Sequence, residues 1–260
     1  MNTRTLISKI GKRFPKKTAE AYDFPGLQVG KFKDETKTVL LCLDFDKFVL
    51  KYMKDNNLLN TIDIIFTHHP FIFGKKRFVF EADPLKKELF EEIEKLNIPI
   101  FSLHTNFDLG KDGMNDALTE LLGLTNVQPL IGDPVGRGGL LEKEMEINAF
   151  AKYAIEKLNV SYGQLTSAGT KNIRKVAIIG GGGWRSWKVA KEEGYDIFIS
   201  GDIPHHGRRD IVNYEYNYLD VPHEVERIFM TQFKKILLSI DNSLEIICVN
   251  QEEEPTIMRK

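Results

Sequence analysis

Residues 38–70, TVLLCLDFDKFVLKYMKDNNLLNTIDIIFTHHP, contain the pattern that decides the fold. Two short apolar runs, TVLLCLD at Thr38–Asp44 and TIDIIFT at Thr61–Thr67, have the length and continuity of buried strands. Residues 46–56 between them are amphipathic and long enough for a helix. A strand, a helix and a strand in this order predict a βαβ unit in a parallel sheet.

The same alternation continues along the chain. Residues 84–97, PLKKELFEEIEKLN, predict a helix with apolar side chains on one face: Leu85, Leu89, Ile93 and Leu96. IPIFSLHT at 98–105 is the next predicted strand, and GMNDALTELLGL at 113–124 is the next helix, with Gly123 suited to its C-terminal end. A looser stretch rich in glycine and proline begins near Thr125, where we expect a boundary.

After this boundary the αβ rhythm resumes and runs to the end of the chain. We expect helices at 146–159, 184–194 and 223–240, and strands at 175–179, 196–202 and 244–251. The sequence therefore predicts an α/β protein with two similar, interlinked lobes, whose sheets are mixed and largely parallel.

Composition and charge exclude several classes of protein. Hydrophobic residues make up 42% and charged residues 28%, which excludes a disordered chain, a collagen and a coiled coil. The net charge is -1, without the basic excess of a nucleic-acid-binding protein. No apolar stretch has the length of a signal peptide or a membrane span. Cys42 and Cys248 lie in apolar runs and are expected in the core of a cytoplasmic protein.

The six histidines fall in clusters that each follow a predicted strand. They are His68 and His69 in THHP, His104 in HTNFD, His205 and His206 in GDIPHH, and His223 in PHEVE. Ligand sites in α/β sheets form at the carboxyl ends of strands, where loops from several strands converge. We therefore expect these clusters to point at one crevice.

The spacing within the clusters suits metal ions. A turn at Pro70 would let His68 and His69 serve two neighbouring ions. A helical turn would put His104 and Asp108 on one side, and the spacing of three does the same for His223 and Glu226. Nitrogen and carboxylate ligands of this kind suit two ions of Zn, Fe, Mn, Co or Ni.

Plainer interpretations stand beside this one. Any single histidine can be an ordinary core or surface residue, and Asp108 or Glu226 can be a helix N-cap. The run Gly180–Gly183 lacks both phosphate-binding signatures, so it is a tight βα turn, or its amides and Arg185 hold an anionic substrate. Trp184 and Trp187, three apart, are expected in the core or at an interface.

The motifs together resemble the NGG-interacting-factor-three-like family, the type 2 homologues of GTP cyclohydrolase I. The resemblance includes GLQVG at 26–30, THHP, LHTNFDLGKDGMNDAL at 103–118, GRGG, VAIIGGGGW, DIFISGDIPHH and DVPHEVE. HTN-x-D followed by G-x-ND-A-L is specific to this family, whereas a histidine pair alone is not. The resemblance covers nearly the whole chain.

The resemblance implies a set of two metal ions per subunit and the residues that hold them: His68, His69, Asp108, His223 and Glu226. It also implies a toroidal homohexamer with its sites facing an internal cavity. Many members have a glutamate where this chain has Arg227, which leaves Glu224 as the alternative to Glu226 for the bridging carboxylate. The G-H that usually precedes this motif is replaced by Pro222-His223.

These implications set the domain and function hypotheses. His223 and Glu226 must return to the lobe with the other ligands, so we expect residues 1–126 plus 222–260 as the first lobe and 127–221 as the second. The metal site would lie in the crevice between the lobes.

Metal-assisted hydrolysis of a nucleotide or phosphoester is the expected activity, with His104 or His206 moving protons. The alternative is a non-enzymatic metal-binding or regulatory protein. An open coordination position would distinguish an enzyme from such a protein. We expect neither a membrane nor a nucleic acid among the partners.

Overall fold

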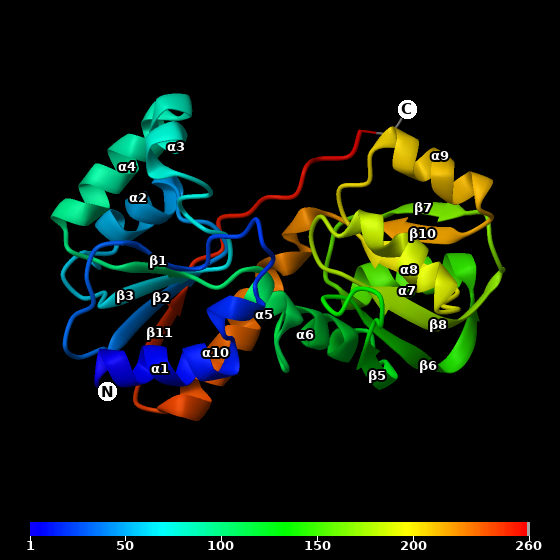
Figure 1. The fold of residues 1–260 in the computed structure, drawn as a ribbon, viewed down its shortest axis with the longest axis horizontal. Coiled ribbons are helices and arrows are strands. Elements are labelled where there is room, and N and C mark those ends of the chain that lie inside the picture. The colour runs from blue at the N-terminus through cyan, green and yellow to red at the C-terminus, as the bar shows by residue number, and fades with distance from the viewer. Residues whose placement is uncertain (259–260) are drawn as a thin grey trace. The chain divides into compact units, whose positions relative to one another are not determined.

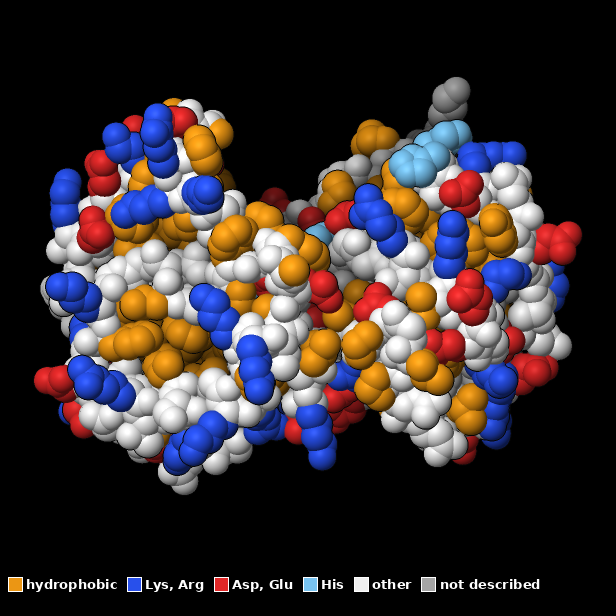
Figure 2. Space-filling model, in the orientation of Figure 1, with side chains coloured by type: hydrophobic (Ala, Val, Ile, Leu, Met, Phe, Trp, Pro, Cys, Tyr) orange, Lys and Arg blue, Asp and Glu red, His pale blue; other side chains and the backbone are white. Residues whose placement is uncertain are grey.

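The computed structural model describes residues 1–258, which divide into two compact units (Figure 1). The first unit contains Met1–Gly110 and Phe229–Glu252, and the second contains Lys111–Ile228 with the described part of Glu253–Lys260. In residues 1–258 no helix is both long and apolar enough to cross a membrane. Charged side chains of both signs are spread over the visible face of each unit (Figure 2). Patches of hydrophobic side chains lie among these charged groups.

The first unit is built on a five-stranded sheet in the order β1-β4-β3-β2-β11. Three of its four pairings are parallel, and only β1 runs antiparallel to its neighbour. The strands are β1 (Gly26–Val29), β2 (Thr38–Cys42), β3 (Ile64–Thr67), β4 (Ile100–Ser102) and β11 (Glu245–Cys248). Since β2 and β3 are fully buried and covered on both faces, their sequences are continuous apolar runs.

Helices cover both faces of this sheet (Figure 1). They are α1 (Thr3–Arg13), η1 (Lys16–Thr18), α2 (Lys47–Asp55), α3 (Lys76–Ala82), α4 (Pro84–Lys95), α5 (Thr105–Leu109) and α10 (Ile228–Ile240). Helix α2 begins where predicted because the Asp46 carboxylate accepts the amides of Phe48 and Val49. Leu40 and Ile65 belong to the core with α2 and α4, while Phe66 meets α10 on the other face.

The second unit is built on a six-stranded sheet in the order β5-β6-β8-β9-β10-β7. Its strands are β5 (Thr125–Pro129), β6 (Arg137–Glu146), β7 (Gln164–Ser167), β8 (Asn172–Ile178), β9 (Ile197–Ser200) and β10 (Asn217–Asp220). The central strands β8, β9 and β10 are parallel, and the other pairings are antiparallel. Its helical segments are α6 (Met114–Leu121), α7 (Ile147–Lys157), η2 (Trp184–Ser186), α8 (Trp187–Glu192), α9 (His205–Asn213) and η3 (His223–Arg227).

The predicted α/β class with two mixed sheets is confirmed, and five of their nine pairings are parallel, three in the first sheet and two in the second. The bounds of the units differ from those of the expected lobes, because three segments pack with the second unit: 111–126, 222–228 and 253–258. Contacts explain the difference. Asp116 pairs with Arg137 of β6, and His223 hydrogen bonds to Asp202 beyond β9.

Two local predictions were wrong. The stretch after Thr125, expected as a loose boundary, forms the antiparallel strands β5 and β6. Glycine is tolerated inside β6 because the Tyr195 ring covers Gly138 where a Cβ would project. Cys42 is buried as expected, but Cys248 is exposed because β11 is an edge strand.

Candidate metal centre

The carboxyl ends of β3 and β4 bring three histidines together in the first unit. His68 and His69 follow β3, and His104 follows β4. Ring centroids of His68 lie 5.0 Å from His69 and 5.2 Å from His104, and those of His69 and His104 lie 5.5 Å apart. One nitrogen from each ring lies within 4.8 Å of the others, so this group can hold a metal ion.

A turn after β3 allows two adjacent histidines to join one cluster. In a regular strand, neighbouring side chains point to opposite faces. Here the amides of His68 and His69 both donate to the carbonyl oxygen of Leu43, and the Thr67 hydroxyl donates to the His69 carbonyl. The chain therefore bends at the histidine pair, as its spacing before Pro70 predicted.

Each of the three rings is held through its Nδ1 atom. His68 Nδ1 donates to the Leu103 carbonyl at 2.9 Å, which requires a proton on Nδ1. His69 Nδ1 lies 2.7 Å from Asp44 Oδ2, and His104 Nδ1 lies 2.8 Å from Asp23 Oδ1. Metal-binding histidines in proteins have this arrangement, because an oxygen on one nitrogen orients the other toward the ion.

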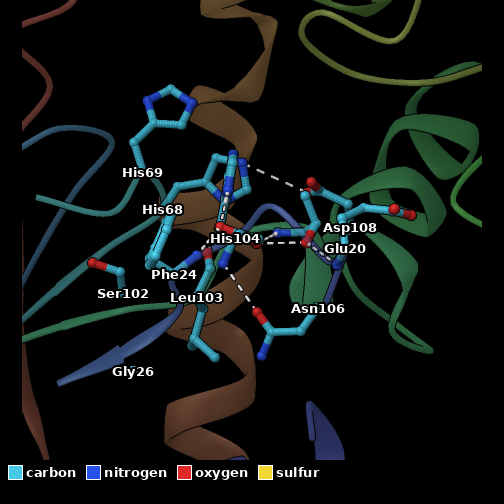
Figure 3. Close-up of polar contacts among 12 residues, drawn as sticks. Glu20, Phe24, Gly26, His68, His69, Ser102, Leu103, His104, Asn106 and Asp108 are labelled. Atoms are coloured by element: carbon cyan, nitrogen blue, oxygen red, sulfur yellow. Dashed lines mark hydrogen bonds and ion pairs between the residues drawn. The ribbon is translucent and has the colours of Figure 1, made fainter. Parts of the chain in front are cut away.

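Asp108 of α5 faces this cluster. Its Oδ1 lies 3.6 Å from Nε2 of the fully buried His68, as the dashed line in Figure 3 shows. The N-cap of α5 is His104, so Asp108 is not the helix cap that the sequence left as an alternative. A nitrogen and a carboxylate oxygen thus meet in a buried position.

The two carboxylates that hold His104 and His69, those of Asp23 and Asp44, remain ionised. Burial alone would raise the pKa of Asp23, but hydrogen bonds from His104 and Thr105 outweigh it and lower that pKa to about 2. Burial also acts to raise the pKa of Asp44, and the hydrogen bond with His69 reverses this and lowers it. Both carboxylates therefore stay negative near neutral pH.

Asparagines of the motif at 103–118 position the backbone. Asn106 accepts the amide of His104 at 3.0 Å and donates to the Phe14 carbonyl at 2.9 Å, which fixes the start of α5 against the end of α1. In the second unit, Asn115 of α6 accepts the Gly180 amide at 2.8 Å and donates to the Val135 carbonyl. These amides therefore shape the loops that carry the histidines and glycines.

A second group lies in the second unit, at the carboxyl ends of β9 and β10. His223 and Glu226 belong to η3, a 3₁₀ helix in which residues three apart are eclipsed. His223 Nε2 lies 3.1 Å from Glu226 Oε2, and its Nδ1 lies 2.6 Å from Asp202 Oδ2. Burial would lower the pKa of His223, but Glu226 and then Asp202 outweigh it and raise that pKa to about 9.

Glu226, and not Glu224, is the carboxylate that pairs with His223, and it is buried. It lies inside η3, whose N-cap is Pro222, so it is not a helix cap either. Arg227 is directed elsewhere, to Glu254 and to the carbonyl oxygen of Asn159. The replacement of a glutamate by Arg227 thus leaves the histidine–carboxylate pair intact in this chain.

Comparison with known proteins decides the family. The model of Duf34/NIF3 (NGG1p interacting factor 3) matches residues 1–255. The chain belongs to the Duf34/NIF3 family. A relative from Clostridium perfringens named GTP cyclohydrolase 1 type 2 homolog is 29% identical over 263 residues, which are 98% of each chain.

Solved structures share the whole fold. A Bacillus cereus protein related to NIF3 covers 100% of this chain and 99% of its own, with a TM-score of 0.86 at 21% identity. Reduced HcgD from Methanocaldococcus jannaschii covers 95% and 97%, with a TM-score of 0.80 at 28% identity. The family inferred from the motifs is therefore confirmed.

The glycine run of this NIF3 chain makes room for the second group. Gly181 has φ +63°, and a Cβ there would overlap Glu226 Oε1 and lie 3.1 Å from His223 Nε2. Its carbonyl accepts the Gly201 amide and the Ser200 hydroxyl. The run is the tight βα turn of the plainer interpretation, and the absence of a side chain at Gly181 leaves room for this histidine–glutamate pair.

We predict that Gly181→Ala destabilises the second unit more than Gly194→Ala does. Both positions have positive φ, which costs about 1–2 kcal/mol for a residue with a Cβ. Only at Gly181 does the new methyl also overlap Glu226, whereas at Gly194 nothing lies within 4 Å. Urea unfolding of both variants measures the difference, and equal losses would contradict the close packing of Glu226.

The remaining predicted site residues lie outside these two groups. His205 and His206 are exposed at the start of α9, where the His206 ring meets Trp184 edge-on at 5.6 Å. Trp187 is buried in the core, as expected, and Arg185 lies over the ring of Trp184.

Sequence reasoning missed the acceptors that orient the histidines. Asp44 and Asp202 lie two residues after the ends of β2 and β9, and this position near a strand end could have identified them. Asp23 precedes β1 and approaches His104 only through the fold. Its sequence context carries no such signal.

Proposed function

We propose that this NIF3-family protein is a metal-dependent hydrolase with two divalent ions per subunit. The observation that carries the proposal is shared by four of the six histidines: His68, His69, His104 and His223. Each has its Nδ1 held by an oxygen at 2.6–2.9 Å, which orients Nε2 as metal ligands require. His205 and His206, the other two, are exposed on α9.

The donor set fits borderline divalent metals. Imidazole nitrogens with carboxylate oxygens suit Zn, Fe, Mn, Co or Ni better than Ca or Mg. Two Nε2 atoms already face carboxylate oxygens, at 3.6 Å for His68 with Asp108 and at 3.1 Å for His223 with Glu226. We propose these four residues and His69 as the ligands, in agreement with the motifs of the family.

The bound ions would lower the pKa of a coordinated water toward neutrality and supply hydroxide for hydrolysis. Asp44, Asp23 and Asp202 hold the histidines in orientation, since each carboxylate fixes one ring. His104, whose ring lies beside His68 and is paired with ionised Asp23, is placed to hold or move a proton.

A nucleotide or phosphoester is the proposed substrate class, which agrees with the name of the Clostridium perfringens relative. We further propose that the protein works in the cytoplasm as a homohexamer, as the family resemblance implies. The test is metal analysis of the purified chain after loading with each candidate ion, followed by a hydrolysis screen with GTP and phosphoesters. Absence of bound metal after loading would overturn the proposal.

Bound metal without any hydrolysis would instead support a metal-binding or regulatory protein. Burial of His68 and Asp108 is compatible with either role, so the screen decides between them. The two roles also differ in the coordination of the bound metal, because an enzyme must keep one coordination position open for water.

We predict that His206→Ala retains both metals but lowers hydrolysis by about 10²–10⁴-fold, as expected for loss of a general acid or base. The matched control is His205→Ala, since His205 is the exposed neighbour on the same helix. Turnover and metal content are measured on both variants. Full turnover in His206→Ala would remove this role, and loss of metal would make His206 a ligand.

A further inference from the structure

Three exposed aromatic side chains extend outward from the histidine cluster of the first unit. The ring of Phe73 lies 6.2 Å from His104, 5.5 Å from Phe24 and 6.5 Å from Tyr22. Their exposed fractions are 50% for Phe73, 41% for Phe24 and 61% for Tyr22. Large aromatic side chains in contact with one another yet open to solvent are typical of a binding surface.

A cavity of about 250 Å³ adjoins these rings. Its wall includes Phe24, Lys16 of η1, Lys76 of α3 and Asp23. The carboxylate of Asp23 is already engaged by His104, Thr105 and the Phe24 amide. The Lys76 ammonium lies 3.4 Å from the centre of the Phe90 ring, so the positive character of this cavity beside an aromatic surface comes from Lys16.

We propose that Phe73, Phe24 and Lys16 form a subsite for a planar aromatic ring that carries an anionic group. This inference rests on the proposed function and names the recognition elements of its substrate. Stacking on an exposed aromatic side chain stabilises a base without fixing its identity, and lysine neutralises a phosphate as a point charge. The contact of Phe73 with His104 places such a ring beside the candidate metal ligands.

A second copy of the chain is the competing occupant of this surface. Charge favours the small molecule, because Lys16 lines the cavity and the carboxylate of Asp23 in its wall is engaged by neighbouring groups. Contact with His104 favours it too, since a substrate must reach the residues that act on it. We therefore assign the surface to the ligand.

Calorimetric titration of the full chain with guanosine 5′-monophosphate tests the subsite, with and without a chelator. Phe73→Ala should weaken binding by about 5- to 100-fold, which corresponds to the stacking of one base. Phe48→Ala is the matched control, because Phe48 is 58% exposed on α2 of the same unit. Lys16→Ala should also weaken binding. Lys17→Ala, which removes the exposed lysine next to Lys16, should leave binding unchanged.

The outcomes separate this inference from the proposed function. Weaker binding in Phe73→Ala and Lys16→Ala supports the subsite, whether or not hydrolysis is found. No binding of the monophosphate, or equal binding by wild type and Phe73→Ala, overturns the subsite and leaves the metal proposal standing. Light scattering provides the last test, since loss of self-association in Phe73→Ala would assign the surface to a second copy and overturn the inference.

Discussion

His69→Ala should weaken metal binding by more than about 100-fold. Loss of an outer partner of a metal ligand already costs about 10–100-fold, and His69 is proposed as a direct ligand. The side chain is partly exposed and lies at the end of β3, so its removal should leave the core of the first unit intact. Elemental analysis after equilibration in a buffer of defined free metal measures the loss.

His205→Ala is the matched control for this experiment. It removes an exposed histidine from α9 and should retain the metal content of the wild type. Circular dichroism and urea unfolding establish that both variants remain folded. Undiminished metal in His69→Ala would show that the ring is no ligand, and its bond to Asp44 would then be purely structural.

Phe233→Ala should lower the free energy of unfolding of the first unit by about 3–5 kcal/mol, the range for a buried phenylalanine cut to alanine. Phe233 of α10 is fully buried and lies against three other rings. Their centroids are 5.2 Å away for Phe66, 5.3 Å for Phe229 and 5.8 Å for Phe107. Urea unfolding measures the change.

Removal of the Phe233 ring should also disturb the candidate site, because its neighbour Phe229 has its ring centroid 5.4 Å from that of His68. Metal affinity of Phe233→Ala should therefore fall as well, although Phe233 is not itself a proposed ligand. Phe48→Ala, an exposed phenylalanine of the same unit, should change neither quantity. A loss below 1 kcal/mol in Phe233→Ala would contradict the tight packing of these four rings.

Much of the candidate site could be predicted from local spacing. His223 and Glu226 meet because three residues make one turn of a 3₁₀ helix, so the geometry is set within five residues. The family and the positions of the histidines after strands were likewise available from motifs. Cys248 could not be placed correctly, since an apolar run does not reveal whether its strand lies at an edge.

The sequence by itself determined the α/β class, several of the helices and the histidine clusters, because periodicity and strand–helix order are local properties. The predicted start of the last helix was wrong, since residues 223–227 form the 3₁₀ helix η3 and α10 begins at Ile228. Only the tertiary structure decided which oxygen holds each histidine. Asp23 is 81 positions from His104, and Asp44 is 25 positions from His69. Partners so distant in sequence are chosen by sheet order and loop path, which depend on the packing of the whole unit.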